Sequence, residues 1–308
     1  MNSPNFVFGS ALVVISIGYV LKSLGFVTTD DAKKISKFLM HTTFPALVFS
    51  TMIKVQFTSE LLWLPFICIA FAILCSFVGF QIFKKEGPEY RGILTMGCSG
   101  YNLGLFAYPL IEGIWGWKGL TYAAMFDIGN SFINFILTYG MGNYFSAKAK
   151  KGNMWKHVFK RIMSLFPFQA MVIGLLVNLL EIPLPFFLTN IVDTIAQGNK
   201  PLVLLLMGIY FSVRLPKKSF LKVFQVLGIR YLLGLSIGLL LFYSLPFDAH
   251  FRNMMLICII LPVGMTLITY SDELNFDTSI AGALVNFSML ISFALMWILV
   301  AVFQMATA

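Results

Sequence analysis

Two interrupted apolar segments contain the residues of this chain best suited to bind a small molecule inside a membrane. The run from Gly97 to Pro109 contains three glycines and a proline, which disfavour an unbroken helix. The second run, Leu261–Gly264, carries Pro262. A proline costs little at the first position of a helix that restarts after such a break, and we expect the prolines to open such half-helices. The restarted helix directs free N–H groups and its positive dipole end at the break, which stabilises an anion. Asn102 adds an amide donor for a carboxylate. The substrate-binding candidates here are Asn102, Gly104, Tyr108, Pro109 and Pro262.

Both breaks are predicted to fall near the same depth in the bilayer. At about 1.5 Å per residue, Asn102 is about 17 Å from Arg91, and Pro262 is about 15 Å from Arg252. The two broken segments could therefore cross near mid-membrane. The alternative is that each break is a kink that relieves tight packing, because Gly and Pro are common in membrane helices.

A polar stripe in a neighbouring segment points to the same region. Asp127, Asn130, Asn134 and Thr138 recur every three to four residues and so share one helix face. A lipid-facing Asp would cost roughly 2.5–3.5 kcal/mol, so this face should contact protein or a cavity. The last segment offers Asn286 with Ser288 and Ser292. Asn130 and Asn286 are therefore further substrate-binding candidates.

Three charged residues leave their roles open. Arg230 lies inside an apolar segment and needs a partner, either Asp127 or a substrate carboxylate, unless it forms a structural ion pair or snorkels to the interface. Asp127 is either a helix-packing hydrogen-bond partner or a proton-coupling residue. Glu112 is either a charge at the rim or a second coupling candidate.

Composition places these residues in an integral membrane protein. The chain is 58% hydrophobic and 11% charged, with a mean hydropathy of +0.85, whereas a soluble surface needs about a quarter of its residues charged. Segments of about twenty apolar residues span a bilayer as helices. The ten predicted segments are 6–24, 36–53, 61–83, 92–116, 119–145, 160–180, 186–212, 220–245, 251–271 and 277–303.

The second half of the sequence repeats the first at a nearly constant offset. Matched residues in similar surroundings are 156 positions apart, or 153 for the prolines of the two breaks. The pairs are Gly18 and Gly174, Pro45 and Pro201, Asn130 and Asn286, and Pro109 and Pro262. Five segments per half is an odd number, so the halves would be inverted in the bilayer, as in many secondary transporters. The predicted divisions are a first repeat at 1–147, a basic cytoplasmic linker at 148–159 and a second repeat at 160–308.

The basic residues predict orientation. With both termini outside, 17 Lys and Arg residues lie at cytoplasmic ends and four lie outside. This asymmetry accounts for the net charge of +9, so no nucleic-acid partner is needed. We expect a multi-pass protein of the plasma (bacterial inner) membrane with the lipid bilayer as its surroundings.

No pattern of catalytic or metal-binding residues stands out. The four cysteines lie inside apolar segments without a CxxC pair or a nearby histidine at ligand spacing. Catalytic triads, HExxH and phosphate-binding glycine loops are also missing from the sequence. We therefore expect no catalytic residue, no metal and no cofactor, with a coupling ion (H+ or Na+) left open.

Four short motifs resemble those of the auxin efflux carrier family, which includes bacterial malate permease-like carriers and plant PIN proteins. Asn102-Leu103-Gly104-Leu105-Phe106-Ala107-Tyr108-Pro109 resembles the family signature Asn-x-Gly-x-x-Gly-x-Pro, with Ala107 where Gly is usual. Supporting matches are Phe44-Pro45-Ala46-Leu47-Val48-Phe49, Asp127-Ile128-Gly129-Asn130 and Leu261-Pro262-Val263. The motifs occur in the family's order and run through most of the chain.

The resemblance implies an all-α membrane protein of ten transmembrane helices, arranged as two inverted five-helix repeats with broken, crossing helices 4 and 9. Helices 1, 2, 6 and 7 would form a scaffold, often as a homodimer, and the other helices a moving domain. Asn102, Pro109 and Pro262 would form the crossover site, with Asn130 and Asn286 beside it. The substrates would be small organic anions, and the short linker is typical of a bacterial carrier.

Three functions follow as hypotheses. The first is a secondary transporter that moves a carboxylate, such as malate or an auxin-like acid, by alternating access. The second is a sodium- or proton-coupled carrier of the bile-acid transporter or antiporter type. The third is a membrane sensor that binds its ligand without moving it.

Overall fold

The described part of the chain is built from helices. The structure is a computed structural model of the 308-residue chain, and it describes residues 3–56, 58–146, 163–212 and 219–305. Within these residues the only strand-like feature is one isolated bridge, between Tyr101 and Val263. The basic linker predicted at 148–159 lies outside the described residues.

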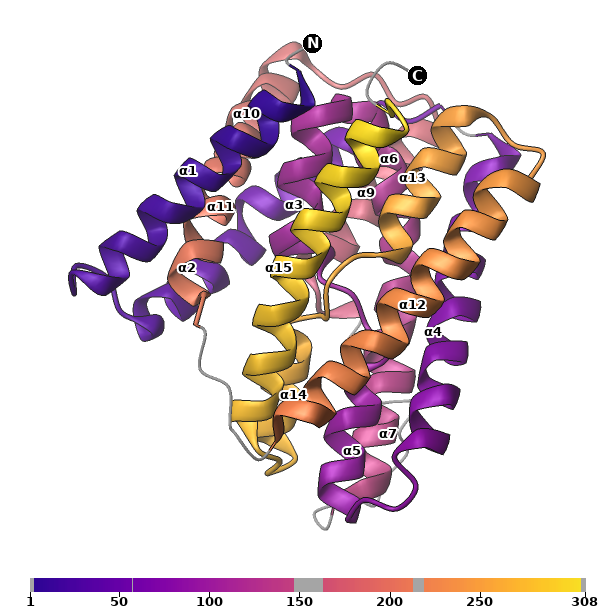
Figure 1. Cartoon of the computed structure of the whole chain (residues 1–308). Helices are drawn as coiled ribbons and strands as arrows, with labels where there is room; N and C mark the ends of the chain where they lie inside the picture. Colours follow the sequence, from indigo (N-terminus) through magenta and orange to yellow (C-terminus); the bar gives the residue numbers. More distant parts are fainter. Residues whose placement is uncertain (1–2, 57, 147–162, 213–218, 306–308) are drawn as a thin grey trace. The chain divides into compact units, whose positions relative to one another are not determined.

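The helices gather into two compact units, and each unit draws on both halves of the sequence (Figure 1). The first unit contains the described parts of Met1–Thr58, Gly104–Ala124 and Phe159–Phe211, and the second those of Ser59–Leu103, Met125–Val158 and Ser212–Ala308. The units therefore differ from the predicted repeats, which remain a prediction about sequence and symmetry.

The first unit is made of short helices joined by tight breaks. Its helices are α1 (Pro4–Ser23), α2 (Thr29–His41), α3 (Thr43–Met52), α9 (Phe166–Leu179), α10 (Phe186–Gln197), α11 (Asn199–Tyr210), most of the π-helical turn η2 (Leu103–Ala107) and the first part of α6 (Tyr108–Phe132). α2 begins with a capping box in which Thr28 and Asp31 satisfy each other's backbone N–H groups. Two predicted segments, 36–53 and 186–212, are each broken once, at Thr42 and at Gly198.

Close helix contacts in this unit come in pairs with the repeat offset. A Cβ at Gly18 of α1 would overlap the carbonyl oxygen of Leu205 on α11. A Cβ at Gly174 of α9 would lie 3.1 Å from the carbonyl oxygen of Phe49 on α3. Gly18 and Gly174, and likewise Phe49 and Leu205, are 156 positions apart. Small residues let the backbones approach in both places.

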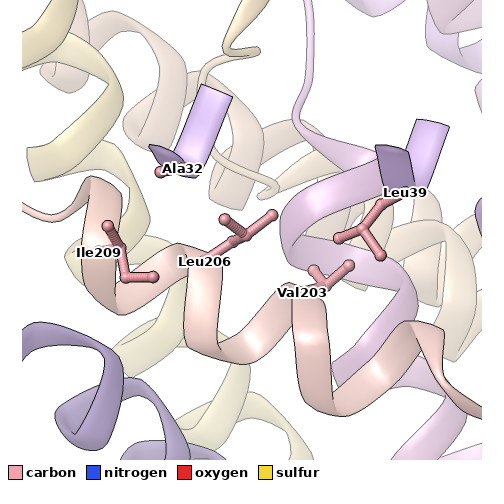
Figure 2. Packing of buried hydrophobic residues seen from close by; sticks show 5 residues of the cluster. All are labelled: Ala32, Leu39, Val203, Leu206 and Ile209. Atoms are coloured by element: carbon pink, nitrogen blue, oxygen red, sulfur yellow. The ribbon is translucent and has the colours of Figure 1, made fainter. Parts of the chain in front are cut away.

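Two further contacts hold the broken helices of this unit together. Ala32 and Leu39 of α2 pack on Val203, Leu206 and Ile209 of α11, as Figure 2 shows. At the helix starts, the Thr43 hydroxyl donates to Asn199 Oδ1 at 3.0 Å, and this pair is also 156 positions apart. Both residues are buried, so the hydrogen bond satisfies polar groups that lipid could not.

The second unit combines long apolar helices with interrupted ones. Its elements are η1 (Ser59–Leu62), α4 (Trp63–Ile82), α5 (Pro88–Gly97), the end of α6, the π-helical η3 (Ile133–Thr138), α7 (Tyr139–Phe145), α12 (Phe220–Ser244), α13 (Ala249–Ile259), α14 (Thr266–Glu273) and α15 (Thr278–Val302). Figure 1 shows the extended segment that joins α13 to α14. α12 packs on α13, and α5 on α7.

Two arginines each bind a carbonyl group near the C-terminal end of the helix that precedes their own. Arg91 of α5 donates to the carbonyl oxygen of Phe80 on α4 at 2.9 Å, and its guanidinium lies 4.0 Å from the Phe80 ring centre. Arg252 of α13 donates to the carbonyl oxygen of Phe242 on α12 at 3.3 Å, with the ring centre at 5.6 Å. Each cation therefore lies at the negative end of the preceding helix.

Four single helices among the described residues are long and apolar enough to cross a membrane. They are Pro4–Ser23, Ser59–Ile82, Phe220–Ser244 and Thr278–Val302. The other predicted segments contain shorter helices, except that α6 has 25 residues with a non-helical backbone at Gly116. Individual helix length thus identifies fewer spans than the apolar segments predict.

Candidate functional site

The two interrupted segments pair with each other through their backbones. Asn102 N donates to the carbonyl oxygen of Pro262 at 2.9 Å, and Gly264 N donates to that of Gly100 at 3.3 Å. Tyr101 and Val263 form the antiparallel bridge between these two hydrogen bonds. Each break thus satisfies backbone groups of the other in a place where lipid could not. We call residues 98–103 and 260–265 the paired breaks.

The position of Pro262 differs from the sequence-based expectation. A proline opening the second half-helix was expected, but α14 begins at Thr266, after an extended stretch that contains Pro262. Pro262 uses its carbonyl group, which proline retains, to accept from Asn102. Pro109 meets the expectation more closely, because it is the second residue of α6.

Asn130 holds the first break from the side. Its Oδ1 accepts from Tyr101 N at 2.8 Å, and its Nδ2 donates to Tyr101 O at 3.1 Å. The amide therefore replaces both helix hydrogen bonds that Tyr101 lacks. Asn130 Nδ2 also donates to Asp127 Oδ1 at 2.9 Å, so the Asp127 carboxylate is one residue removed from the paired breaks.

The polar stripe extends along the same face. Asn134 Nδ2 donates to Asn130 Oδ1 at 3.0 Å, and Asn134 Oδ1 accepts from the Thr266 hydroxyl at 2.9 Å. A Cβ at Gly100 would overlap Asn134 Oδ1, so the backbone must lack a side chain here. The stripe therefore connects Asp127 to the first residue of α14, and sequence analysis gave no sign that Thr266 would take part.

A second group of polar residues supports the other break. Val263 N donates to the Ser288 hydroxyl at 3.0 Å, and the Ser292 hydroxyl donates to the carbonyl oxygen of Ile260 at 2.7 Å. The Tyr231 hydroxyl donates to the Ser288 carbonyl oxygen at 2.7 Å. Tyr231 was missed from the sequence because its ring is apolar enough to suit any membrane helix.

Asn286 lies near this group but has other partners. Its Oδ1 accepts from Ser212 N at 3.1 Å, and its Nδ2 donates to the carbonyl oxygen of Gly282 at 2.8 Å. Asn130 and Asn286, although 156 positions apart, thus differ in their bonding: Asn130 holds a break directly, whereas Asn286 holds the backbone at Ser212.

Arg230 is buried and donates to backbone carbonyls. Its exposed fraction is 4%, and its Nη1 donates to the carbonyl oxygens of Ser99 and, at 3.5 Å, Gly97. Its Nη2 donates to the carbonyl oxygen of Leu261 at 3.2 Å. The guanidinium carbon lies 4.8 Å from the centre of the Tyr101 ring, a cation–π distance. Snorkelling is wrong for this residue, and no ion pair with Asp127 is found among the described residues.

The remaining candidates belong to the first unit. Gly104 and Tyr108 both contact the ring of Phe44, which lies 3.4 Å from a Cβ placed on Gly104 and 5.0 Å between ring centres from Tyr108. Two motifs of the family resemblance therefore meet through this ring. Glu112 is half-buried on α6, and the Lys200 ammonium lies against the adjacent Gly113.

A family comparison decides what kind of protein this is. The family model described as "Membrane transport protein" matches residues 10–300. The chain belongs to this family of transporters. It is therefore an integral membrane transport protein and not an enzyme, in agreement with the auxin efflux carrier motifs.

Two relatives of this transporter are themselves described as transporters. A protein of Methanothermobacter thermautotrophicus, described as an uncharacterized transporter, is 23% identical over 291 residues, which cover 92% of this chain and 93% of the relative. An uncharacterized transporter of Methanocaldococcus jannaschii is 26% identical over 211 residues, or 65% and 67% of the two chains. The likeness thus extends over both halves of the transporter.

The transporter's other reactive groups do not form a site. In the described residues no group of three His, Cys, Asp or Glu could hold a metal ion. All four cysteines are buried as free thiols. The polar groups at and beside the paired breaks are therefore backbone N–H and carbonyl groups, side-chain amides and hydroxyls, one guanidinium and one carboxylate.

Proposed function

We propose that this transporter carries a small organic anion, such as malate or an auxin-like acid, by alternating access. The pairing of the two breaks is the observation on which the proposal rests. It places α14 directly after a break, and the first turn of α14 has no side-chain cap. Leu267 N and Ile268 N of this turn donate to the carbonyl oxygens of Gly264 and Met265, so it is mainly the positive helix end that favours a carboxylate. Asn102, buried in the other of the paired breaks, adds its amide.

The second unit is the one we assign to carry the substrate. It contains both breaks together with Asn130, Asn286 and Arg230. In the family resemblance the first unit, which holds Gly104, Tyr108 and Pro109, corresponds mainly to the scaffold. We also propose that the scaffold forms a homodimer.

Two inverted repeats of five spans, with both termini outside the plasma membrane, remain our proposal for topology. It is supported by the contacts in the first unit that recur with the 156-residue offset. It is also supported by the matched positions of Arg91 and Arg252, each of which lies near the start of its helix, α5 or α13, and donates to a carbonyl group near the end of the preceding helix. An odd number of spans per repeat requires this inversion.

Asp127 is the stronger of the two coupling candidates. Its carboxylate binds Asn130, which holds Tyr101 in the paired breaks, so a proton on Asp127 would change a hydrogen bond at the break itself. Glu112 belongs to the other unit, where Lys200 lies close by. Proton coupling through Asp127 is therefore the second proposal, and a sensor role has no observation in its favour.

Flux measurements in proteoliposomes test the anion proposal. We expect labelled malate or indole-3-acetate to enter vesicles containing the native protein, and Asn102→Ala to lower the initial rate at least about tenfold, because a hydrogen bond to a charged group contributes about 1.5–3 kcal/mol. Asn190→Ala, at an exposed asparagine of α10, is the matched control and should behave like the native protein.

The outcomes separate the functions. Flux that falls in Asn102→Ala but not in Asn190→Ala supports an anion site at the paired breaks. Binding of either anion without flux would indicate a sensor. Flux that the Asn102 variant leaves unchanged would remove Asn102 from the site.

A further inference from the structure

Arg230 holds the two broken segments together through their carbonyl ends. The carbonyl group of Gly97 ends α5, that of Ser99 follows two residues later, and that of Leu261 follows the end of α13. All three accept hydrogen bonds from one guanidinium. The last carbonyl groups of a helix carry its negative partial charge, so Arg230 neutralises two helix ends at once.

These carbonyl ends are also where a coupling cation would bind. In transporters with broken helices, unwound backbone carbonyls and half-helix C-terminal ends coordinate sodium or receive a proton. Here the guanidinium already donates to them, and the residue is 96% shielded from solvent. A sodium ion would have to displace a permanently charged, buried side chain and would meet like charge.

The other charged and ionisable groups near Arg230 do not reduce the repulsion that a sodium ion would meet. Asp127 faces the paired breaks through Asn130, and the Tyr101 ring covers the guanidinium. Cys68, Cys75 and Cys98 are buried thiols in the same unit. Among the described residues of this unit, the hydrogen-bond acceptors of Arg230 are the three backbone carbonyl groups, and no carboxylate forms an ion pair with it.

We infer that Arg230 is a positioning residue that acts as a built-in cation, in place of a coupling sodium ion, so that transport through the paired breaks is independent of sodium. The inference rests on the proposed function. It also divides the paired breaks by charge: Arg230 occupies the carbonyl ends, while the N-terminal end of α14 remains for the anion.

The native protein provides the first test. We expect the initial rate of malate or indole-3-acetate uptake to be the same when potassium or N-methylglucamine replaces sodium at fixed pH, ionic strength and membrane potential. A sodium gradient that drives accumulation would overturn the inference. Absence of flux in every medium would instead count against the proposed function.

A measurement that does not need flux tests the sodium inference separately from the proposed function. Thermal exposure of the buried thiols to a maleimide dye, in sodium and in potassium chloride, should give equal midpoints for the native protein. A midpoint raised by sodium alone would show a sodium site and would contradict the inference even if no transport is found.

Variants test the position of the cation. Arg230→Gln should lower maximal flux about tenfold or more, because charge-assisted hydrogen bonds to two helix ends are lost, and added guanidinium chloride should restore part of it. Arg252→Gln is the matched control, since Arg252 also binds a carbonyl group and a ring but away from the breaks. Equal flux in both variants, or no rescue by guanidinium in a folded Arg230→Gln protein, would refute the role.

Discussion

Asn130→Asp is the most informative single substitution, because it keeps the shape of the side chain and replaces its amide donor by a carboxylate oxygen. Asn130 Nδ2 donates to Tyr101 O and to Asp127 Oδ1. Losing one neutral hydrogen bond and one to a carboxylate costs about 2–4 kcal/mol. Placing a second carboxylate near Asp127 adds repulsion of about the same size at an effective dielectric of 20. The hydrogen-bond loss alone should lower the melting temperature of the second unit by about 4–16 °C.

The native cysteines allow the melting temperature of the second unit to be measured without adding labelling sites. All four thiols are buried, and all lie in the second unit. A dye that fluoresces on reacting with thiols therefore reports the unfolding of the unit that contains Asn130. The native protein and Asn130→Asp would be heated in the same detergent, and their midpoints compared.

A swap provides the control. Asp127→Asn combined with Asn130→Asp restores one amide and one carboxylate, so the double variant should melt above Asn130→Asp. A double variant no more stable than Asn130→Asp, or an Asn130→Asp protein that melts like the native one, would show that the Asn130 amide does not hold the break.

Two further substitutions test the first unit. Gly18→Ala should destabilise it by about 1–3 kcal/mol, because a Cβ would overlap the Leu205 carbonyl oxygen. In the control Gly9→Ala, the new Cβ would have nothing within 4 Å, so the unit should be as stable as before or more stable by up to about 1 kcal/mol. Equal melting temperatures of the two variants by circular dichroism would count against close packing at Gly18. The Thr28 hydroxyl and backbone N–H lower the pKa of Asp31 below its ordinary value of 3.8. This stabilisation is therefore present above about pH 3.8 and is lost as the pH falls through the lowered pKa. Thr28→Ala should raise that pKa, and an unchanged carboxyl 13C NMR titration of the variant would exclude the capping box as its cause.

Interruption of the two central segments could be predicted from sequence, because three glycines and a proline around Asn102, and Pro262 with Gly264, oppose a continuous helix. The polar stripe from Asp127 to Thr138 could likewise be placed on one face from its spacing. These features depend on local backbone preferences and helix periodicity, which a sequence contains directly.

The breaks at Thr42 and Gly198 and the partners of Arg230 could not be predicted in the same way. Pro45 and Pro201 in the first turns of α3 and α11 were a usable signal for helix starts, but an apolar run around them suggested one span. Arg230 seemed to need an acidic partner, because a sequence shows side chains and hides backbone carbonyls. Its acceptors exist only where two helices end, and that depends on tertiary structure.

The hydrogen bond between Thr43 and Asn199 has a consequence for the origin of the chain. On the proposed repeat, these are equivalent positions, so a five-span ancestor inserted in both orientations would have paired this position with its own copy. A single residue facing itself must serve as donor and acceptor together, which a hydroxyl or an amide can do and a charged group cannot. Gene duplication would then have freed the two copies to differ, with a hydroxyl on one side and an amide on the other.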